Sequence, residues 1–184
     1  MRRFFYGKKD VFSFLKDVYS LVLVALFIAI YGVLSLLRIY IIPNQLRISF
    51  TFMPVAWAAM LFGPVAGGLT GALGDVIGWA INPVGPFFPG FTLNAFIVGF
   101  MYGMFFYKKE ITLKRVIAAV VTITPVVDLV LNPVWLSIMT GEAFKVLVFT
   151  RIVKSLIMLP VKCLILYTSG VLMKKFVPSR IRRV

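Results

Sequence analysis

The sequence predicts an all-α integral membrane protein with six transmembrane helices. Apolar residues make up 61% of its 184 residues, against about 45–50% in soluble domains, and the mean hydropathy is +0.99. Gly and Pro residues divide this apolar sequence into segments that we interpret as helices. A soluble fold of this length could not bury so much apolar surface, so we expect the chain to form one transmembrane domain over 1–184.

The first predicted helix runs from Val18 to Leu37, which is long enough to cross a hydrocarbon core of about 30 Å. Basic residues precede it, as in a signal peptide, but no small-residue cleavage site follows, so we expect it to be retained. The other predicted helices run from Ser49 to Phe62, Val65 to Ile81, Phe91 to Tyr107, Val116 to Met139 and Phe144 to Met173. The helix from Ser49 is short for a full crossing, so we expect it to stand steeply or to end at a cavity.

Charge predicts the orientation of these helices. The net charge is +14, and most basic residues lie in an N-terminal arm over 1–17, a loop over 108–115 and a tail over 174–184. Six crossings place these three segments on one side of the membrane, and the positive-inside rule makes that side the cytoplasm. Membrane topology therefore explains the charge, and no nucleic acid partner is expected.

Several kinds of chemistry are excluded by composition. The sequence has no His, which excludes His acid/base catalysis and His zinc ligands. Its one Cys, Cys163, lies in an apolar segment, so we expect neither a disulfide nor a Cys metal site. Because there is no GxxxxGK[ST] phosphate loop, any active transport would need separate ATPases. We expect no cofactor.

Polar residues lie at helical spacing within three predicted helices, where each polar side chain is costly and points to a role. They are Asp75, Trp79 and Asn82 in the third helix, Asp128, Asn132 and Trp135 in the fifth, and Arg151, Lys154 and Ser155 in the sixth. In the third and fifth helices the spacing is i, i+4 and i+7, which puts the three side chains on one face. Pro133 is expected to loosen the backbone hydrogen bonding of the fifth helix.

The charged residues have two interpretations. In the first, Asp75 and Asp128 pair with Arg151, Lys154 or Lys162 and only neutralise buried charge. In the second, basic side chains near the outer pocket outnumber these carboxylates and bind an anionic ligand. We favour the second interpretation because aromatic residues are grouped nearby.

The loop over 82–91 is expected on the outer side, between the third and fourth helices. Its sequence, NPVGPFFPGF, combines prolines that stiffen it with glycines that permit turns. Phe87, Phe88 and Phe91 would be exposed unless they covered a ligand, so we expect a lid, with an interfacial aromatic belt as the alternative. The loop over 39–48 adds polar residues at the same mouth: Asn44, Gln45 and Arg47.

Small residues recur at close spacing, as in helices that pack tightly in lipid. They are Gly67, Gly71, Gly74 and Gly78 in the third helix, Gly99 and Gly103 in the fourth, and Ala25 and Ala29 in the first. Helix packing explains the glycines, whereas a docking role stays open for the alanines. Gly74-Asp75 is similar to the Gly-x-Gly-Asp motif of intramembrane aspartyl proteases, but Ala72 replaces the first glycine, so an enzyme that uses Asp75 and Asp128 is the more distant alternative.

Several short motifs are similar to those of one family. They are Arg47-Ile48-Ser49-Phe50, Leu61-Phe62-Gly63-Pro64, Gly71-Ala72-Leu73-Gly74-Asp75, Phe88-Pro89-Gly90-Phe91-Thr92-Leu93 and Leu131-Asn132 through Trp135-Leu136-Ser137. The chain resembles the substrate-binding (S) components of energy-coupling factor (ECF) transporters, and the Phe-Pro-Gly-Phe and Asn-x-x-Trp-Leu-Ser motifs resemble the folate-specific members. Pro133 departs from the family pattern, in which we expect threonine.

The resemblance implies a folate-binding importer subunit, not an enzyme, in a bacterial cell membrane. It implies docking through Ala25 and Ala29 onto a transmembrane coupling subunit of the EcfT type, which carries two cytoplasmic ATPases. An S component for another vitamin or small aromatic compound is the nearer alternative, since it keeps the fold and changes the ligand. The candidate ligand-binding residues are Arg47, Asp75, Trp79, Phe88, Phe91, Asn94, Asp128, Asn132, Trp135, Arg151 and Lys154.

Folate combines a flat pterin, a benzoate ring and a glutamate, so its site needs stacking rings, a carboxylate or amide, and cations. Asp75 or Asp128, with Asn132, is the hypothetical partner of the pterin. The stacking rings would be Trp79, Phe88 and Trp135, and the cations at the glutamate would be Arg47, Arg151 and Lys154.

Overall fold

The computed structural model describes residues 17–37, 39–42, 46–83 and 85–176. In chain order its elements are α1 (Val18–Leu36), β1 (Ile39–Ile42), β2 (Leu46–Ile48), α2 (Phe52–Phe62), α3 (Pro64–Ile81), α4 (Pro89–Phe106), α5 (Leu113–Ile123), the π-helix η2 (Thr124–Leu131), α6 (Asn132–Thr140) and α7 (Phe144–Phe176). Since α5, η2 and α6 form one continuous helix, the described residues form six helical segments, as predicted. Five are long and apolar enough to cross a membrane, and α2 is the short one.

The helices begin and end near the predicted residues, and local chemistry explains the differences. Pro89 opens α4 two residues before the predicted start, because proline fits the first turn of a helix, where no amide donor is needed. Thr112 caps α5, accepting a hydrogen bond from the Arg115 amide at 3.4 Å. Between α2 and α3, Gly63 adopts a φ of 97°, which lets the chain reverse within one residue before Pro64 begins α3.

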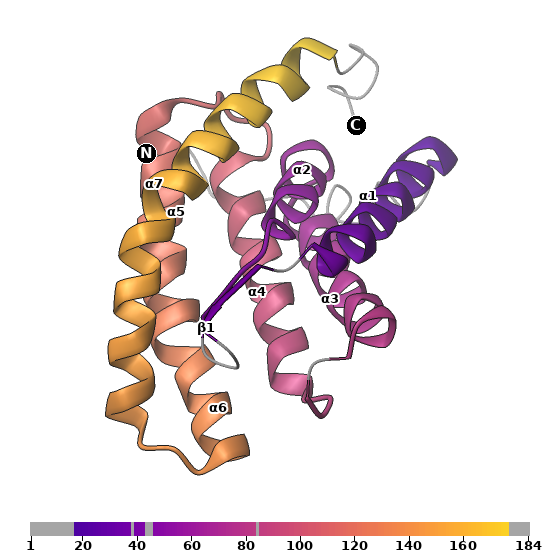
Figure 1. The fold of residues 1–184 in the computed structure, drawn as a ribbon. Helices are drawn as coiled ribbons and strands as arrows, with labels where there is room; N and C mark the ends of the chain where they lie inside the picture. Colours follow the sequence, from indigo (N-terminus) through magenta and orange to yellow (C-terminus); the bar gives the residue numbers. More distant parts are fainter. Residues whose placement is uncertain (1–16, 38, 43–45, 84, 177–184) are drawn as a thin grey trace.

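Two features were not predicted. Residues of the first outer loop form a short antiparallel hairpin, in which Tyr40 pairs with Arg47 and Ile39 with Ile48. Figure 1 shows this hairpin extending from α1 across the bundle, and β2 contacts α7. The second feature is η2, where hydrogen bonds reach back five residues, as from the Asn132 amide to the Val127 carbonyl. It ends just before Pro133, so the backbone loosening expected there takes the form of wider turns.

The glycines of α3 and α4 allow the two backbones to touch. A Cβ atom added at Gly99 would lie 2.1 Å from the Gly67 carbonyl oxygen, and one added at Gly71 would lie 2.3 Å from the Ala95 carbonyl oxygen. On α3, Gly74 packs against the ring of Tyr31 from α1 in the same way. The packing interpretation of the glycines is therefore confirmed, and α3 and α4 form a rigid pair that fixes the side chains they carry.

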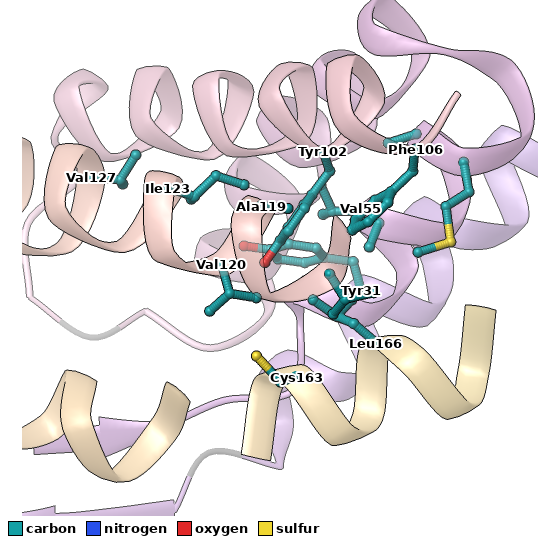
Figure 2. Packing of buried hydrophobic residues seen from close by; sticks show 14 residues of the cluster. Tyr31, Val55, Tyr102, Phe106, Ala119, Val120, Ile123, Val127, Cys163 and Leu166 are labelled. Atoms are coloured by element: carbon teal, nitrogen blue, oxygen red, sulfur yellow. The ribbon is translucent and has the colours of Figure 1, made fainter. Parts of the chain in front are cut away.

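The main core lies where α2, α4, α5 and α7 meet. Figure 2 shows its residues, among which Tyr102, Phe106, Val120 and Leu166 are almost fully buried. Tyr31 from α1 joins them, and its ring lies close to that of Tyr102 with both hydroxyl groups pointing the same way. The polar residues of the candidate site lie next to this core.

Candidate functional site

A cavity of about 210 Å³ lies next to this core. Helices from both halves of the chain line it, because α3 and α4 supply one wall and η2, α6 and α7 supply the other. The lining residues that bear on the argument are Tyr31, Asp75, Phe91, Asn94, Tyr102, Asp128, Asn132, Lys154, Met158 and Lys162. Six of the candidate ligand-binding residues are thus brought together around one space: Asp75, Phe91, Asn94, Asp128, Asn132 and Lys154.

Each wall follows from helical spacing. On α7, Lys154, Met158 and Lys162 lie at i, i+4 and i+8, so all three face the cavity. On α4, Asn94 and Tyr102 occupy the same relation, eight residues apart. Both helices therefore present a stripe that combines polar and apolar groups over about two turns.

A chain of hydrogen bonds joins three of the candidate residues to Asp128. The Trp135 indole donates to Asn94 Oδ1 at 3.1 Å, and Asn94 Nδ2 donates to Asn132 Oδ1 at 3.1 Å. Asn132 Nδ2 in turn donates to Asp128 Oδ1 at 3.3 Å. Asn94 is only 4% exposed, so its amide is held within the protein by these two bonds.

Asp128 forms an ion pair with Lys162, with 3.0 Å between Nζ and Oδ2. The neutralising interpretation therefore holds for this carboxylate, because both of its oxygens have partners within the chain. Among the described lining residues, Asp75 and Asp128 face Lys154 and Lys162 in equal number. A surplus of positive charge would therefore have to come from cations beyond these four, such as Arg151 on α7.

Asp75 lies on the opposite wall, on α3. Thr92 donates a hydrogen bond from Oγ1 to Asp75 Oδ2 at 2.9 Å, which links α3 to the first turn of α4 and fixes the carboxylate at the cavity wall. Thr92 follows the predicted lid over 82–91 directly, so this bond joins α3 to α4 just beyond the lid. The two carboxylates thus lie on different helices, with the Thr92 hydroxyl donating to Asp75 and the Lys162 ammonium donating to Asp128.

The aromatic candidates divide into two groups. Phe88 packs against Trp135, with 5.7 Å between ring centroids, and against Phe91 at 6.0 Å, so these three rings form a cluster beside the cavity. Trp79 is separate from it, because its indole donates to the Gly85 carbonyl at 3.1 Å and its ring contacts Phe87 at 5.3 Å. Trp79 supports the loop and does not line the cavity.

The remaining candidate cations are Arg151 and Arg47. Arg151 is partly buried on α7, one turn before Lys154 on the same face. The backbone of Arg47 pairs with Tyr40 in the hairpin that contacts α7, but its side chain lies outside the described part of the chain, as do Asn44 and Gln45.

A second hollow runs along the outer surface of α1 and α3. It is an apolar groove of about 540 Å³, lined by Ala25, Ile28, Ala29, Gly32, Val33, Leu36, Ile77 and Ile81. The small residues of α1 leave space along one side of the groove, and the side chains of Ile77 and Ile81 from α3 form the other side.

The family model for "ECF transporter, substrate-specific component" matches residues 19–170. The chain belongs to this family. Two relatives of this S component, both named folate transporter FolT, come from Clostridium novyi and Leuconostoc mesenteroides. The first is 50% identical over 66% of this chain and 71% of its own length, and the second is 34% identical over 82% and 84%. A solved structure titled "Crystal structure of FolT bound with folic acid" aligns with a TM-score of 0.75 and 38% identity, over 82% of this chain and 93% of that one.

Sequence reasoning did not name as candidates several of the residues that line the S component's cavity, and three of them are Lys162, Tyr31 and Tyr102. Lys162 was considered only as a partner for a carboxylate, and Tyr31 and Tyr102 were not considered. Helical spacing contained the signal for two of them, since Lys162 lies eight residues after Lys154 and Tyr102 eight after Asn94. No comparable signal exists for Tyr31, because its place depends on how α1 packs against Gly74.

Proposed function

We propose that this S component binds folate at its cavity and delivers it to the cell through an ECF coupling module. The observation that carries the proposal is the alignment with a FolT structure whose title names bound folic acid. The 50% identity to the Clostridium novyi FolT supports the same ligand. Catalysis forms no part of the proposal, because ATP hydrolysis is assigned to separate subunits.

The cavity offers groups that suit each part of folate. Asp75 and the amide of Asn132 line opposite walls of the cavity, where a pterin ring between them would find acceptors for its N–H groups. Phe88, Phe91 and Trp135 form a ring cluster against which an aromatic ligand would stack. Lys154 and Arg151, on one face of α7, would bind the glutamate carboxylates, and Arg47 belongs to the strand beside them.

The groove along α1 suits the proposed coupling subunit. A transmembrane helix of that subunit would pack closely against Ala25 and Ala29, since small residues let helix backbones approach in lipid. We assign this surface to an EcfT-type coupling subunit that carries two cytoplasmic ATPases.

The proposed location is the bacterial cell membrane, with both chain ends in the cytoplasm. The described connections fit this orientation, because α3–α4 and α6–α7 join at one end of the bundle and α4–α5 joins at the other (Figure 1). The basic loop between α4 and α5 would then face the cytoplasm, as the positive-inside rule requires.

Titration of the purified protein with folate tests the proposal. We expect quenching of tryptophan emission, because Trp135 lies in the ring cluster beside the cavity. Calorimetry on the same sample should give a matching dissociation constant. Unchanged emission together with no heat of binding would exclude folate, and equal displacement by a neutral vitamin would favour the alternative S component.

Arg151→Ala is expected to weaken binding of folate about tenfold to a hundredfold, the scale of a hydrogen bond to a charged group. Pteroic acid should lose less than about threefold, because it lacks the two glutamate carboxylates that the Arg151 guanidinium is proposed to bind. Lys145→Ala, an exposed charge on the same helix, is the matched control. Equal losses for both ligands would mean that Arg151 supports the fold instead.

A further inference from the structure

One series of hydrogen bonds beside the cavity runs toward the carboxylate of Asp128. Trp135 donates to Asn94, Asn94 to Asn132, and Asn132 to Asp128, while Lys162 donates to Asp128 from the other side. Each amide accepts through its oxygen and donates through its nitrogen. The series therefore has one direction, from the ring cluster to the ion pair.

A negative charge at the acceptor end strengthens such a series. A charged acceptor makes a stronger hydrogen bond than a neutral one, and each bond polarises the next in a low-dielectric site. The carboxylate of Asp128 thus determines which way the amides of Asn132 and Asn94 face. Since Asn94 is nearly fully buried, it transmits this orientation to the indole of Trp135.

Lys162 makes that charge tolerable within a membrane-spanning helix. An uncompensated carboxylate in such a place is strongly unfavourable, and the ammonium of Lys162 contacts Asp128 at 3.0 Å. Lys162 belongs to α7, whereas the three amide and indole groups belong to α4 and α6. One ion pair therefore ties α7 to the polar network of the opposite helices.

We propose that Lys162 is a positioning residue of the ligand site. Through Asp128 it orients the amides of Asn132 and Asn94 and so holds the Trp135 indole in contact with Phe88. Lys162 itself makes no contact with the ligand. This inference rests on the proposed function for its effect on folate. The orientation of Trp135 without ligand is independent of that function.

The test is a double-mutant cycle with two readouts. Lys162→Met, Asp128→Asn and the pair together are made in a Trp57→Phe, Trp79→Phe background, in which Trp135 is the remaining one of the three tryptophans. The emission maximum of Trp135 is measured first without ligand, and folate affinity is then measured by calorimetry. Lys145→Met, an exposed position of α7, is the control for loss of a lysine.

Lys162→Met should shift the Trp135 emission of the unliganded protein and weaken folate roughly tenfold to a hundredfold. The double variant should recover both readouts, with affinity within about tenfold of the background protein. The reason is that the neutral amide introduced by Asp128→Asn can still accept from Asn132 and leaves no unpaired charge. Lys145→Met should change neither readout.

Three outcomes would overturn the proposal. The first is an unshifted Trp135 emission in Lys162→Met, and the second is a double variant that loses more affinity than either single variant, as expected for direct contact with the ligand. If Lys162→Met does not fold, the charge-neutral double variant is used in its place. The third overturning outcome is a loss of folate affinity of more than about a hundredfold in that double variant. Absence of folate binding in the wild-type protein would refute the proposed function alone, since the emission shift would still test the positioning role.

Discussion

Replacing Ala29 by tryptophan is expected to reduce folate uptake to below about one tenth of the wild-type rate in cells that contain the coupling module, while folate binding by the purified chain is retained. Ala29 lines the apolar groove of α1 and α3, where an indole would fill the space that the proposed coupling helix needs. The ligand cavity is lined by other residues, so affinity should not change. Uptake of labelled folate and calorimetry measure the two effects separately.

Leu26→Trp provides the control for this experiment. Leu26 is half exposed on the same helix but does not line the groove, so tryptophan there should leave uptake unchanged. Equal loss of uptake in both variants would show that α1 tolerates no added bulk in lipid, and unchanged uptake in Ala29→Trp would exclude the groove as the docking surface.

Gly99→Ala is expected to lower the free energy of unfolding by about 3 kcal/mol, the upper end of the cost of overpacking. The new Cβ atom would lie 2.1 Å from the Gly67 carbonyl oxygen, and a backbone atom cannot turn aside as a side chain can. The α3–α4 pair would separate, and Asp75 and Asn94 would lose their relative positions. The thermal midpoint in detergent and folate affinity should both fall.

Gly170→Ala is the matched control on α7. Its added Cβ would meet the end of the Ile111 side chain at 2.9 Å, and this flexible group can move aside. We expect a change of less than about 1 kcal/mol. A similar loss for both glycine variants would indicate that added side-chain volume at any helix contact, and not the close approach of α3 and α4, determines the stability, because helix propensity alone favours alanine over glycine.

Composition and periodicity were sufficient to predict the fold. Apolar segments divided by Gly and Pro give the number of helices, and glycine spacing predicts close helix packing, which the structure places between α3 and α4. The hairpin was missed because β1 and β2 are short and follow an apolar helix without a clear alternation of polar and apolar residues. Hydropathy cannot separate such strands from a loop.

The candidate site was partly predictable, because helical spacing shows which residues share a face. Asp128 and Asn132 share a helical face, so their common cavity follows from spacing. The pairing of Asp128 with Lys162 was one of several that sequence allowed, because choosing among Arg151, Lys154 and Lys162 requires the rotation of α7 against η2. Trp79 shows the limit of the method, since a shared face with Asp75 did not bring it to the cavity.

The wide turns of η2 change the direction in which the cavity-lining side chains that follow it point. A stretch of π-helix is an α-helix that has accommodated an additional residue, and each residue of a regular helix advances the face by about 100°. Everything after that stretch, from Asn132 to Trp135, is therefore rotated relative to α5 by an amount that a regular helix would not supply. The directions in which these side chains point depend on the length of the segment as well as on its composition, so a relative one residue shorter here would offer its cargo a different set of groups.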